Sequence, residues 1–329
     1  MRFTHTAHTA ARTATHHLPA NPMQAAQLQD TALRYFLEVV RSGSISEAAT
    51  RLCVSGSAVS RQIPGLEALL DTVLFDRRPR GMVPSAAGEL LAVHARRSAL
   101  EAERVVADMQ SLKGLRRGRV RLASAPGFAI EFLPHAIGDF RQRFPGIQFQ
   151  LQVASPAEVT TAVLHGDADI GLTYSRAAEP GLAVAHRQTA PGLAILRPDH
   201  PLARLRTVTL AQMHPHPIAL PDRANTVRQL FDIGCSHRGL VFEPVLASTS
   251  FEALTHYVLH TGSLSISGEI TVRHRIARGE LHGVAIRERG MDGRVIELQT
   301  LEGRTLPEGV RSFLHFLQQQ LPVPKREDN

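Results

Sequence analysis

The chain has few of the residues and segments that would place it outside a reducing cell interior. Its only cysteines are Cys53 and Cys235, far apart in sequence, so a disulfide framework is excluded and a reducing compartment is favoured. No apolar run approaches the roughly 18–20 residues of a membrane helix, and residues 1–17 have no apolar core of the kind that a secretory signal needs. We therefore expect a cytoplasmic protein without membrane contact, whose 329 residues hold two or three domains.

Motifs of catalysis and of cofactor binding are also missing. No nucleophile elbow, P-loop or glycine-rich nucleotide fingerprint after a strand is present. Asp167 and Asp169 form a close carboxylate pair, but they stand where the chain enters a strand, and turn chemistry with capping explains them. His214 and His216 flank a proline without a third ligand, which indicates a loop. We therefore expect no catalytic residue, no metal site and no cofactor; an enzyme built on the C-terminal part is the weakest alternative.

Positive charge is concentrated in the N-terminal third. Residues 31–121 carry 15 Lys and Arg against 9 Asp and Glu, a net charge of +6, whereas residues 122–329 carry 20 against 20, a net charge of zero. Only two of the 37 basic residues are Lys, which favours bidentate contacts of Arg with phosphate or guanine, although a genome rich in G and C explains it as well. A nucleic-acid module joined to a neutral remainder fits this distribution.

Residues 1–27 are expected to form a disordered extension. They are rich in Thr, Ala and His and show no hydrophobic period. Four of them are histidines, but no metal-ligand spacing repeats among these. Translation that begins at Met23 would remove most of this segment, and the sequence leaves both starts open.

Three short helices with sharp turns are predicted between residues 28 and 84. The first shows one apolar face at i, i+3, i+4 and i+7, formed by Leu33, Phe36, Leu37 and Val40. Gly43 ends it, Ser44 or Ser46 caps the second helix, and Ser55 caps the third. Between the last two helices, Cys53 is expected to fill a gap in the core as a small hydrophobe. A third helix that is polar at its start indicates a helix-turn-helix that binds double-stranded DNA.

The polar face of the third helix supplies most of the candidate DNA contacts. A major groove admits a helix start with small side chains, and Arg and Gln read base edges. A basic hairpin follows and is expected to form a wing that reaches phosphates or a minor groove, although a lone basic turn is more often solvated surface. The candidate DNA-binding residues are Ser44, Ser55, Gly56, Ser57, Ser60, Arg61, Gln62, Arg77, Arg78 and Arg80.

A long helix with a heptad seam is predicted over residues 85–113. Its small and apolar positions alternate by four and three, at Leu91, Ala95, Ser98, Ala102, Val105, Met109 and Leu112. The flanking residues are charged, so only a narrow stripe remains. A narrow stripe favours a two-helix contact in a homodimer or homotetramer over a helix that lies on its own domain. Residues 114–119 then break the helix and form a hinge.

Strands and helices alternate between residues 120 and 323. The first unit reads as strand 119–124, helix 128–144, strand 147–153, helix 156–165 and strand 167–174. The second reads as strands 193–197, 218–220 and 241–246 with helices 225–237 and 251–260. This order implies parallel sheets with helices on both faces. Two such units would form a clamshell, with subdomain I at about 120–188 and 292–323 and subdomain II at about 189–291.

The order of these elements resembles that of the LysR-type transcriptional regulators. The resemblance is carried by Gly43-Ser44-Ile45-Ser46-Glu47-Ala48-Ala49, Val54-Ser55, Ala58-Val59-Ser60-Arg61-Gln62-Ile63, Leu66-Glu67, Leu74-Phe75, Arg80-Gly81 and Ala87-Gly88-Glu89, and it extends more weakly to about residue 320. It implies an α/β protein overall, with an all-α winged helix-turn-helix at the N-terminus and a periplasmic-binding-protein-like (type 2) effector domain. It also implies ligand-responsive regulation of transcription, with RNA polymerase as a further partner.

Two positions depart from the pattern of this family. Gly56 stands where the family usually has Gln, which removes an amide that reads bases. Pro64 and Gly65 fall inside the third helix, where a proline costs roughly 3 kcal/mol because it lacks an N–H and clashes with the preceding turn. We expect a kink or an end of the helix there. A small-molecule-binding protein with a weakened DNA module is therefore the alternative to a sequence-specific regulator.

Residues that follow the predicted strands mark the candidate effector site. In open α/β sheets ligands bind beyond the carboxyl ends of strands and near helix N-termini, which favour small anions. For each single residue, a role as a helix cap is the alternative. The expected effector is a small organic anion, and the candidate residues are Ser124, Pro126, Ser155, Thr173, Thr226 and Thr249.

Overall fold

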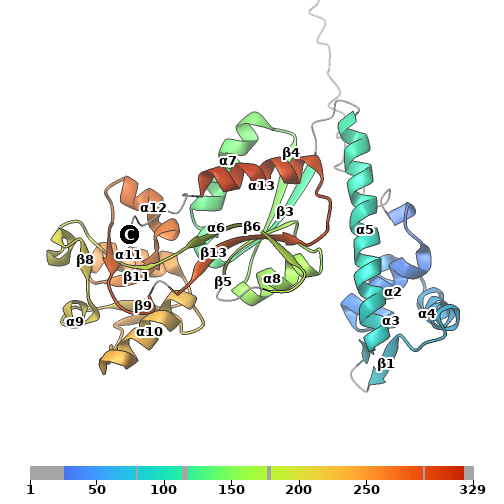
Figure 1. The fold of residues 1–329 in the computed structure, drawn as a ribbon, viewed down its shortest axis with the longest axis horizontal. Helices are drawn as coiled ribbons and strands as arrows, with labels where there is room; N and C mark the ends of the chain where they lie inside the picture. Colours follow the sequence, from blue (N-terminus) through green and yellow to red (C-terminus); the bar gives the residue numbers. More distant parts are fainter. Residues whose placement is uncertain (1–25, 79–80, 113–117, 176–178, 292, 322–329) are drawn as a thin grey trace, which may run out of the picture.

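The long helix α5 (Ala86–Leu112) lies beside three N-terminal helices, and the α/β part of the chain begins on its other side (Figure 1). A computed structural model describes residues 26–78, 81–112, 118–175, 179–291 and 293–321. The predicted extension, except for residues 26 and 27, and most of the predicted hinge lie outside these residues. None of the helices in the described ranges is long and apolar enough to cross a membrane.

The N-terminal helices form as the capping residues predict. They are α2 (Thr31–Ser42), α3 (Ile45–Leu52) and α4 (Gly56–Leu70). Ser44, rather than Ser46, caps α3 by accepting the backbone N–H of Glu47, and Ser55 caps α4 by accepting that of Ala58. Apolar faces of the three helices share one core, which includes Phe36, Ala48, Val59, Ile63 and Leu66.

For this unit the role expected of Cys53 is wrong, and so is an end of the third helix at Pro64, while the kink expected there stays a prediction. Cys53 does not fill a gap in the core: it is exposed, has a φ of 56° and ends α3 as its C-cap. Likewise, α4 does not end at Pro64 but continues to Leu70. Pro64 is exposed, while Ile63 and Leu66 on the opposite face are buried in the core. Packing of this apolar face therefore outweighs the missing N–H of the proline.

A two-stranded wing connects these helices to α5. The strands β1 (Phe75–Arg78) and β2 (Gly81–Pro84) pair antiparallel, as the basic hairpin predicts. The N–H of Met82 donates to the carbonyl of Gly43 at 2.8 Å, which holds the wing against the turn after α2. At the start of α5, a Cβ on Gly88 would lie 2.1 Å from the Leu74 carbonyl oxygen. Glycine is therefore required where α5 crosses the wing.

The first α/β unit is built on a five-stranded sheet of order β4-β3-β5-β13-β6. Its strands are β3 (Gly118–Ser124), β4 (Ile147–Val153), β5 (Ile170–Ser175), β6 (Leu182–Thr189) and β13 (Val295–Leu301). The first three are parallel as predicted, but β13 pairs antiparallel with both β5 and β6, so the sheet is mixed. Its helices are α6 (Pro126–Ala129), α7 (Phe132–Arg143), α8 (Pro156–Leu164) and α13 (Glu308–Gln320). Of these, α8 covers the face opposite α7 and α13 (Figure 1).

The second α/β unit carries a four-stranded sheet of order β11-β7-β12-β8 and a parallel pair, β9 and β10. The parallel sheet predicted for this unit is wrong, because β7 pairs antiparallel with both β11 and β12, and only β12 and β8 are parallel. Its strands are β7 (Gly192–Leu196), β8 (Thr207–Val208), β9 (Ala219–Pro221), β10 (Leu246–Ser248), β11 (Ser265–Gly268) and β12 (His282–Ile286). Its helices are η1 (Pro201–Arg204), α9 (Leu210–Met213), α10 (Thr226–Arg238), α11 (Phe251–Thr261) and α12 (Glu269–Ala277). The strand predicted at 241–246 is wrong, because only the short β10 forms, near its end.

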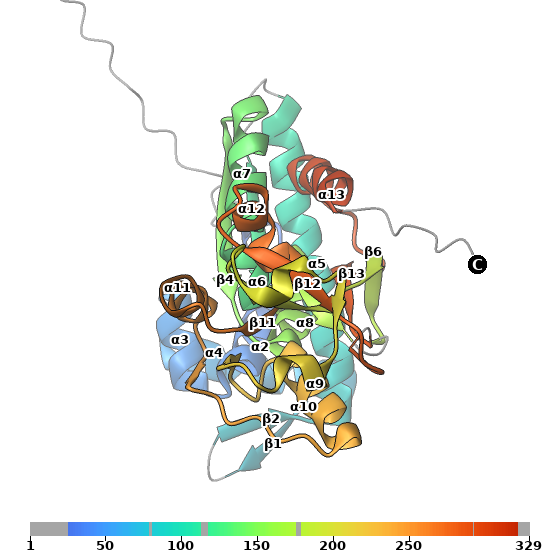
Figure 2. The same cartoon turned by 90° about the vertical axis from the view of Figure 1, so that its left-hand side faces the viewer.

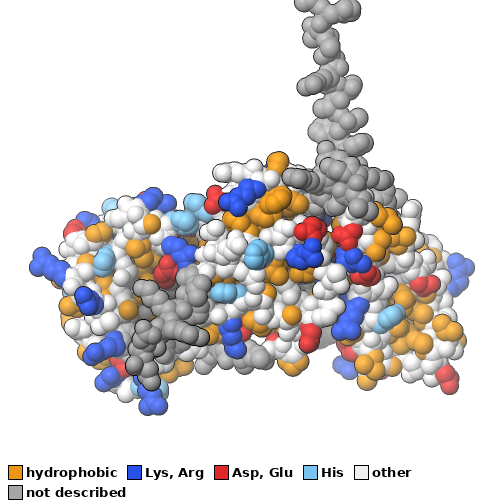
Figure 3. Space-filling view, turned by 45° about the horizontal axis from the view of Figure 1, so that its top comes forward, with side chains coloured by type: hydrophobic (Ala, Val, Ile, Leu, Met, Phe, Trp, Pro, Cys, Tyr) orange, Lys and Arg blue, Asp and Glu red, His pale blue; other side chains and the backbone are white. Residues whose placement is uncertain are grey.

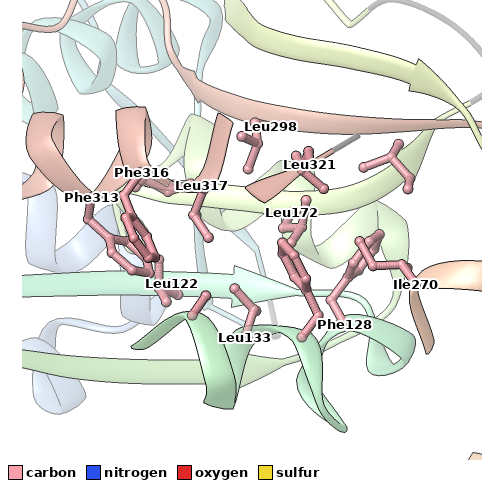
Figure 4. Close-up of a cluster of buried hydrophobic side chains, with 14 of the residues drawn as sticks. Leu122, Phe128, Leu133, Leu172, Ile270, Leu298, Phe313, Phe316, Leu317 and Leu321 are labelled. Atoms are coloured by element: carbon pink, nitrogen blue, oxygen red, sulfur yellow. The ribbon is translucent and has the colours of Figure 1, made fainter. Parts of the chain in front are cut away.

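Helix α12 follows a strand of the second unit and packs on both units, with Val272 in a core of the second. Its Ile270 lies in the core of the first unit, beside Phe128 of α6 (Figure 4), and the helix contacts α7 (Figure 2). The same core is filled by Phe313 and Phe316 of α13, close to Leu122 of β3. The two units are thus joined by buried apolar contacts as well as by the chain connections.

The first unit also contacts the N-terminal part of the chain. Arg121 of β3 pairs with Glu103 of α5 at 3.1 Å, and Asp167, after α8, lies 3.6 Å from Arg41 of α2. Although residues 122–329 have no net charge, basic side chains gather on the second unit, at the left end of the molecule in Figure 3.

Candidate effector cleft and DNA-binding surface

A cavity of about 200 Å³ lies between the two α/β units. Its lining comes from the loops after β3, β4, β9 and β10, from the end of β5, from the start of α12 and from Arg294. These loops follow the carboxyl ends of strands, where ligands bind in open α/β sheets. Within the described residues no group of three His, Cys, Asp or Glu side chains is placed to hold a metal ion.

Four helices of eight or more residues begin at this cavity. Three of them have caps that use their own side chains: Ser155 accepts from Glu158 in α8, Asn225 caps α10, and Ser250 caps α11. The fourth helix, α12, begins after Gly268 and has no side-chain cap. The N–H groups of its first turn therefore remain available for an acceptor supplied from elsewhere.

The six predicted effector residues divide into two groups. Pro126, Ser155, Thr226 and Thr249 line the cavity, whereas Ser124 and Thr173 do not. Ser124 is fully buried, and Thr173 shares the face of β5 that carries Gly171, whose Cβ position lies against α8. Because side chains alternate along a strand, the next residue after Thr173 faces the cavity instead.

That residue, Tyr174, and Arg294 are functional candidates that sequence reasoning missed. Arg294 is 2% exposed. Its Nε donates to the Ala190 carbonyl at 2.9 Å, and its Nη1 donates to the Thr226 hydroxyl at 3.3 Å. Its guanidinium carbon lies 4.1 Å from the centroid of the Tyr174 ring. Arg294 therefore bridges β5 of the first unit and α10 of the second.

The electrostatics of this pair follow from its burial. Burial lowers the pKa of Arg294, and it raises the pKa of the Tyr174 hydroxyl. No carboxylate among the described residues forms an ion pair with Arg294, and its Nη2 is buried without a hydrogen-bond partner there. The cavity thus holds a cationic group that lacks a counter-charge.

In the helix-turn-helix, α4 presents a polar face to solvent. Ser57, Ser60 and Arg61 are exposed, and Gln62 is half-buried. The Ser55 hydroxyl caps the helix and lies 3.0 Å from that of Ser57. Gly56 has open space around its Cβ position. The predicted contacts of this helix therefore share one accessible surface.

The structure describes only some of the other predicted DNA-binding residues. Ser44 is half-buried and caps α3. Arg78 is exposed at the end of β1, and Arg77 precedes it on that strand. Arg80 lies outside the described residues.

Comparison with known proteins decides the family. Residues 31–89 match the profile described as "Bacterial regulatory helix-turn-helix protein, lysR family", and residues 113–322 match "LysR substrate binding domain". The chain belongs to the LysR family. It is a transcriptional regulator with a helix-turn-helix DNA-binding domain and a substrate-binding effector domain, and the family consists of regulators, not enzymes.

Individual relatives agree with this assignment. The chain is 32% identical to a probable RuBisCO transcriptional regulator of Cyanidioschyzon merolae over 61% of this chain and 67% of that protein. It is 28% identical to the uncharacterized HTH-type transcriptional regulator YeiE of Escherichia coli K12 over 77% and 85% of the two chains. Full-length OxyR C199D from Pseudomonas aeruginosa has the same fold, with a TM-score of 0.64 and 16% identity over 92% of this chain and 95% of that chain.

Part of the heptad seam of this LysR-family regulator packs on the DNA-binding domain of the same chain, and part of it is exposed. Leu91 packs against the core of the helix-turn-helix and Ala95 is buried in it, so the prediction that the whole seam faces a second chain is wrong for these residues. Ala102 is buried against Val106. Ser98 and Val105 are half-buried, Met109 is 57% exposed, and the side chain of Leu112 lies outside the description.

Large apolar side chains are exposed beside the seam instead. Leu90 and Val93 of α5 are 76% and 43% exposed, and Leu69, Leu70 and Val73 at the end of α4 and just after it are 79%, 45% and 62% exposed. Monomeric proteins leave such patches bare mainly where a partner binds.

Proposed function

We propose that this regulator binds a two-fold DNA operator through α4 and the wing. The single observation that carries the proposal is the division of α4 into a buried apolar face and an exposed polar face that ends in Arg61. A helix divided in this way rests on its domain while its polar side enters a major groove.

Each candidate residue has a role in this proposal. Arg61 and Gln62 read base edges, and Gly56 leaves room for the close approach of the backbone. The remaining candidates contact phosphates or the minor groove, which positions the helix without reading sequence; they are Ser44, Ser55, Ser57, Ser60, Arg77, Arg78 and Arg80.

The proposed assembly is a homodimer or homotetramer formed through α5. The exposed side chains of Leu90, Val93 and Met109 support it, because a second copy would cover them. A two-fold dimer matches a two-fold operator, with half-sites about one helical turn of DNA apart.

The proposed effector is a small organic anion that binds in the cleft. Helix N-termini around the cavity support this class of ligand. Pro126, Ser155, Thr226 and Thr249 would surround it, whereas Ser124 and Thr173 are withdrawn from this role because neither lines the cavity. Closure of the cleft would shift how the dimers lie on DNA, and through this their contact with RNA polymerase in the cytoplasm.

The proposed domain limits follow the predicted ones. The DNA-binding domain spans 28–84, the dimerisation helix 85–113 and the effector domain 120–323, preceded by an extension at 1–27 and a hinge at 114–119.

The test is a gel shift and footprint on the DNA upstream of the gene, with competitor DNA and at two salt concentrations. We expect a protected two-fold site that survives competitor. Arg61→Ala should weaken it about 5- to 150-fold, because a good base contact contributes roughly 1–3 kcal/mol. Arg97→Ala, which removes an exposed charge from α5, is the matched control. Binding that competitor abolishes, and that Arg61→Ala leaves unchanged, would refute the proposal.

A further inference from the structure

We propose that Arg294 binds the oxyanion group of the effector, in a cradle that it forms with the first turn of α12. The inference rests on the proposed function, because it specifies the ligand of the same cleft. It begins from the Nη2 group of Arg294, which is buried and has no hydrogen-bond partner among the described residues. A buried charged donor without an acceptor is costly, and sites of this kind are completed by a ligand more often than they are left open.

Among the described residues no carboxylate pairs with Arg294: Glu269, in the first turn of α12, is held by Arg273 instead. Its Nε and Nη1 are held by neutral oxygens of Ala190 and Thr226. The carboxylate of the lining, that of Asp222, is exposed and accepts from the backbone N–H of Ala224, so solvent screens its repulsion of an anion. A negative group at Nη2 would therefore meet one uncompensated cation.

The start of α12 lies at the same place. A Cβ on Gly268 would be 2.5 Å from Nη2 of Arg294 and 3.1 Å from the Tyr174 hydroxyl. Glycine thus brings the backbone that begins α12 next to the free end of the guanidinium. Since α12 has no side-chain cap, its first N–H groups and the positive end of its dipole favour an anion at this point.

The geometry also limits the ligand. Two of the three nitrogens of Arg294 already have partners, so Nη2 is left to donate to one oxyanion group, either a carboxylate or a phosphate. A cavity of about 200 Å³ is below the roughly 300–1,000 Å³ of sites for drug-sized ligands. Phe251, Pro126 and Pro221 provide apolar lining. We therefore assign the site to a small acid with one terminal oxyanion and a short body.

The same contacts explain how such a ligand would hold the cleft closed. Arg294 stacks on Tyr174 of the first unit and bonds to Thr226 of the second. An anion bound at Nη2 and at α12 would fix all three elements together. Its binding energy would then favour the closed arrangement of the two units.

The experiment measures the thermal stability of the full-length protein with simple oxyanions as probes. Sodium phosphate, sulfate, acetate and propionate are titrated into the millimolar range against sodium chloride of matched ionic strength. We expect a saturable rise of Tm for the wild type with at least one probe. A response to phosphate and sulfate alone identifies a phosphorylated ligand, and a response to acetate and propionate identifies a carboxylic acid.

The variants decide which residue is responsible. Arg294→Gln should lose the saturable rise, and Gly268→Ala should weaken it at least tenfold because its methyl group would crowd Nη2. Arg223→Gln is the matched control, since Arg223 is exposed and next to Asp222 but does not line the cavity. A cooperative melting transition without added oxyanion, at a Tm close to that of the wild type, shows that each variant is folded. If Arg294→Gln keeps the full response, or if no probe stabilises the wild type, the inference is wrong.

A further variant separates this failure from that of the proposed cleft. Thr249→Trp places a large side chain at the exposed edge of the cavity and leaves Arg294 itself unchanged. A response lost in Thr249→Trp but kept in Arg294→Gln would retain the cleft and reject Arg294. A response kept in both would place the anion elsewhere and reject the effector site itself.

Discussion

At the scale of single residues, Asp169 has the clearest energetic consequence. The sequence presented it as part of a carboxylate pair at a turn, but it is a buried centre of charge. Its Oδ1 lies 2.8 Å from both Arg121 and Arg304, and its Oδ2 accepts the Arg121 N–H at 2.8 Å. Burial alone would raise the pKa of Asp169, but Arg121 and Arg304 hold it below the ordinary value of an Asp.

Replacement of this carboxylate should therefore destabilise the effector domain. Asp169→Asn leaves Arg121 and the buried Arg304 without their counter-charge, and we expect the free energy of unfolding to fall by about 3–5 kcal/mol. Urea denaturation at neutral pH measures it. Asp139→Asn, on the exposed side of α7, should change stability by less than about 0.5 kcal/mol. Equal effects of the two substitutions would contradict a central role for Asp169.

Pro64 gives a second prediction for a single residue. Because α4 continues past it to Leu70, Pro64→Ala should restore one backbone hydrogen bond without changing the surface that meets DNA. We expect the unfolding free energy to rise by about 1–2 kcal/mol, after the entropy that proline removes from the unfolded chain is deducted. Affinity for the operator should change less than twofold. A large gain in affinity would instead revive the alternative of a weakened DNA module.

Single residues also show where sequence reasoning stopped. The sequence locates the carboxyl end of β5 correctly and predicts Thr173 as its effector-binding residue, but it is the next residue, Tyr174, that faces the cavity. A buried strand has no polar alternation from which the facing side can be read. Arg294 carried no signal of its own, since its position depends on a chain crossing that brings residues 190 and 226 beside it.

At the scale of elements, the sequence is most informative where neighbouring residues alone determine the structure, as at the starts of helices. Helix caps at Ser44, Ser55 and Ser155 form as predicted, because a cap involves only the first turn of its own helix. Parallel pairing of β3, β4 and β5 followed from their alternation with helices. The antiparallel entry of β13 did not, since it joins the sheet from the far end of the chain.

Helix α5 shows that a heptad seam can pack in part on its own domain. A heptad repeat predicts an apolar stripe, but it does not determine whether that stripe packs on the same chain or on a second one. Its first half packs on the DNA-binding domain through Leu91 and Ala95, while Leu90 and Val93 remain exposed on the same turns. The exposed face of α5 that we propose as the contact with a second copy is thus rotated around the helix from the predicted heptad seam.

This rotation makes a prediction about assembly. Leu90→Glu should shift the protein from dimer or tetramer toward monomer, because a charge would be buried in the proposed contact. Light scattering after gel filtration measures the mass. Val241→Glu, at an equally exposed apolar residue of the second unit, is the control and should leave the DNA-binding dimer intact. An unchanged mass for Leu90→Glu would exclude this face from the interface.

At the scale of the whole molecule, β5 connects the cleft with the DNA-binding part. Tyr174 at its carboxyl end lines the cavity. At its amino end, Asp169 binds Arg121, which pairs with Glu103 of α5. Asp167 reaches Arg41 of α2. A strand that contacts both regions is the kind of rigid element through which two sites can be coupled.

His165 makes this contact region sensitive to pH. It ends α8 and is exposed at the surface. Partial desolvation of its imidazole lowers the pKa of His165, and Arg96 and Arg41 lower it further, while Asp167 and Glu89 oppose them. Because the folded-state pKa is below the unfolded value of about 6.5, the unfolded chain takes up its proton first as the pH falls. The contribution of His165 to the unfolding free energy is therefore fully present above about pH 6.5 and is lost as the pH falls below it.

The prediction is that His165→Gln removes part of this acid sensitivity. Between about pH 7.5 and 5.5 the wild type should lose more unfolding free energy than the variant, since a glutamine side chain takes up no proton in this range. Urea denaturation of both proteins at each pH gives the difference, and the other histidines contribute equally to the two curves. Parallel profiles would mean that His165 keeps its ordinary pKa in the folded protein, and the region around Arg96 and Asp167 would then tolerate a further positive charge.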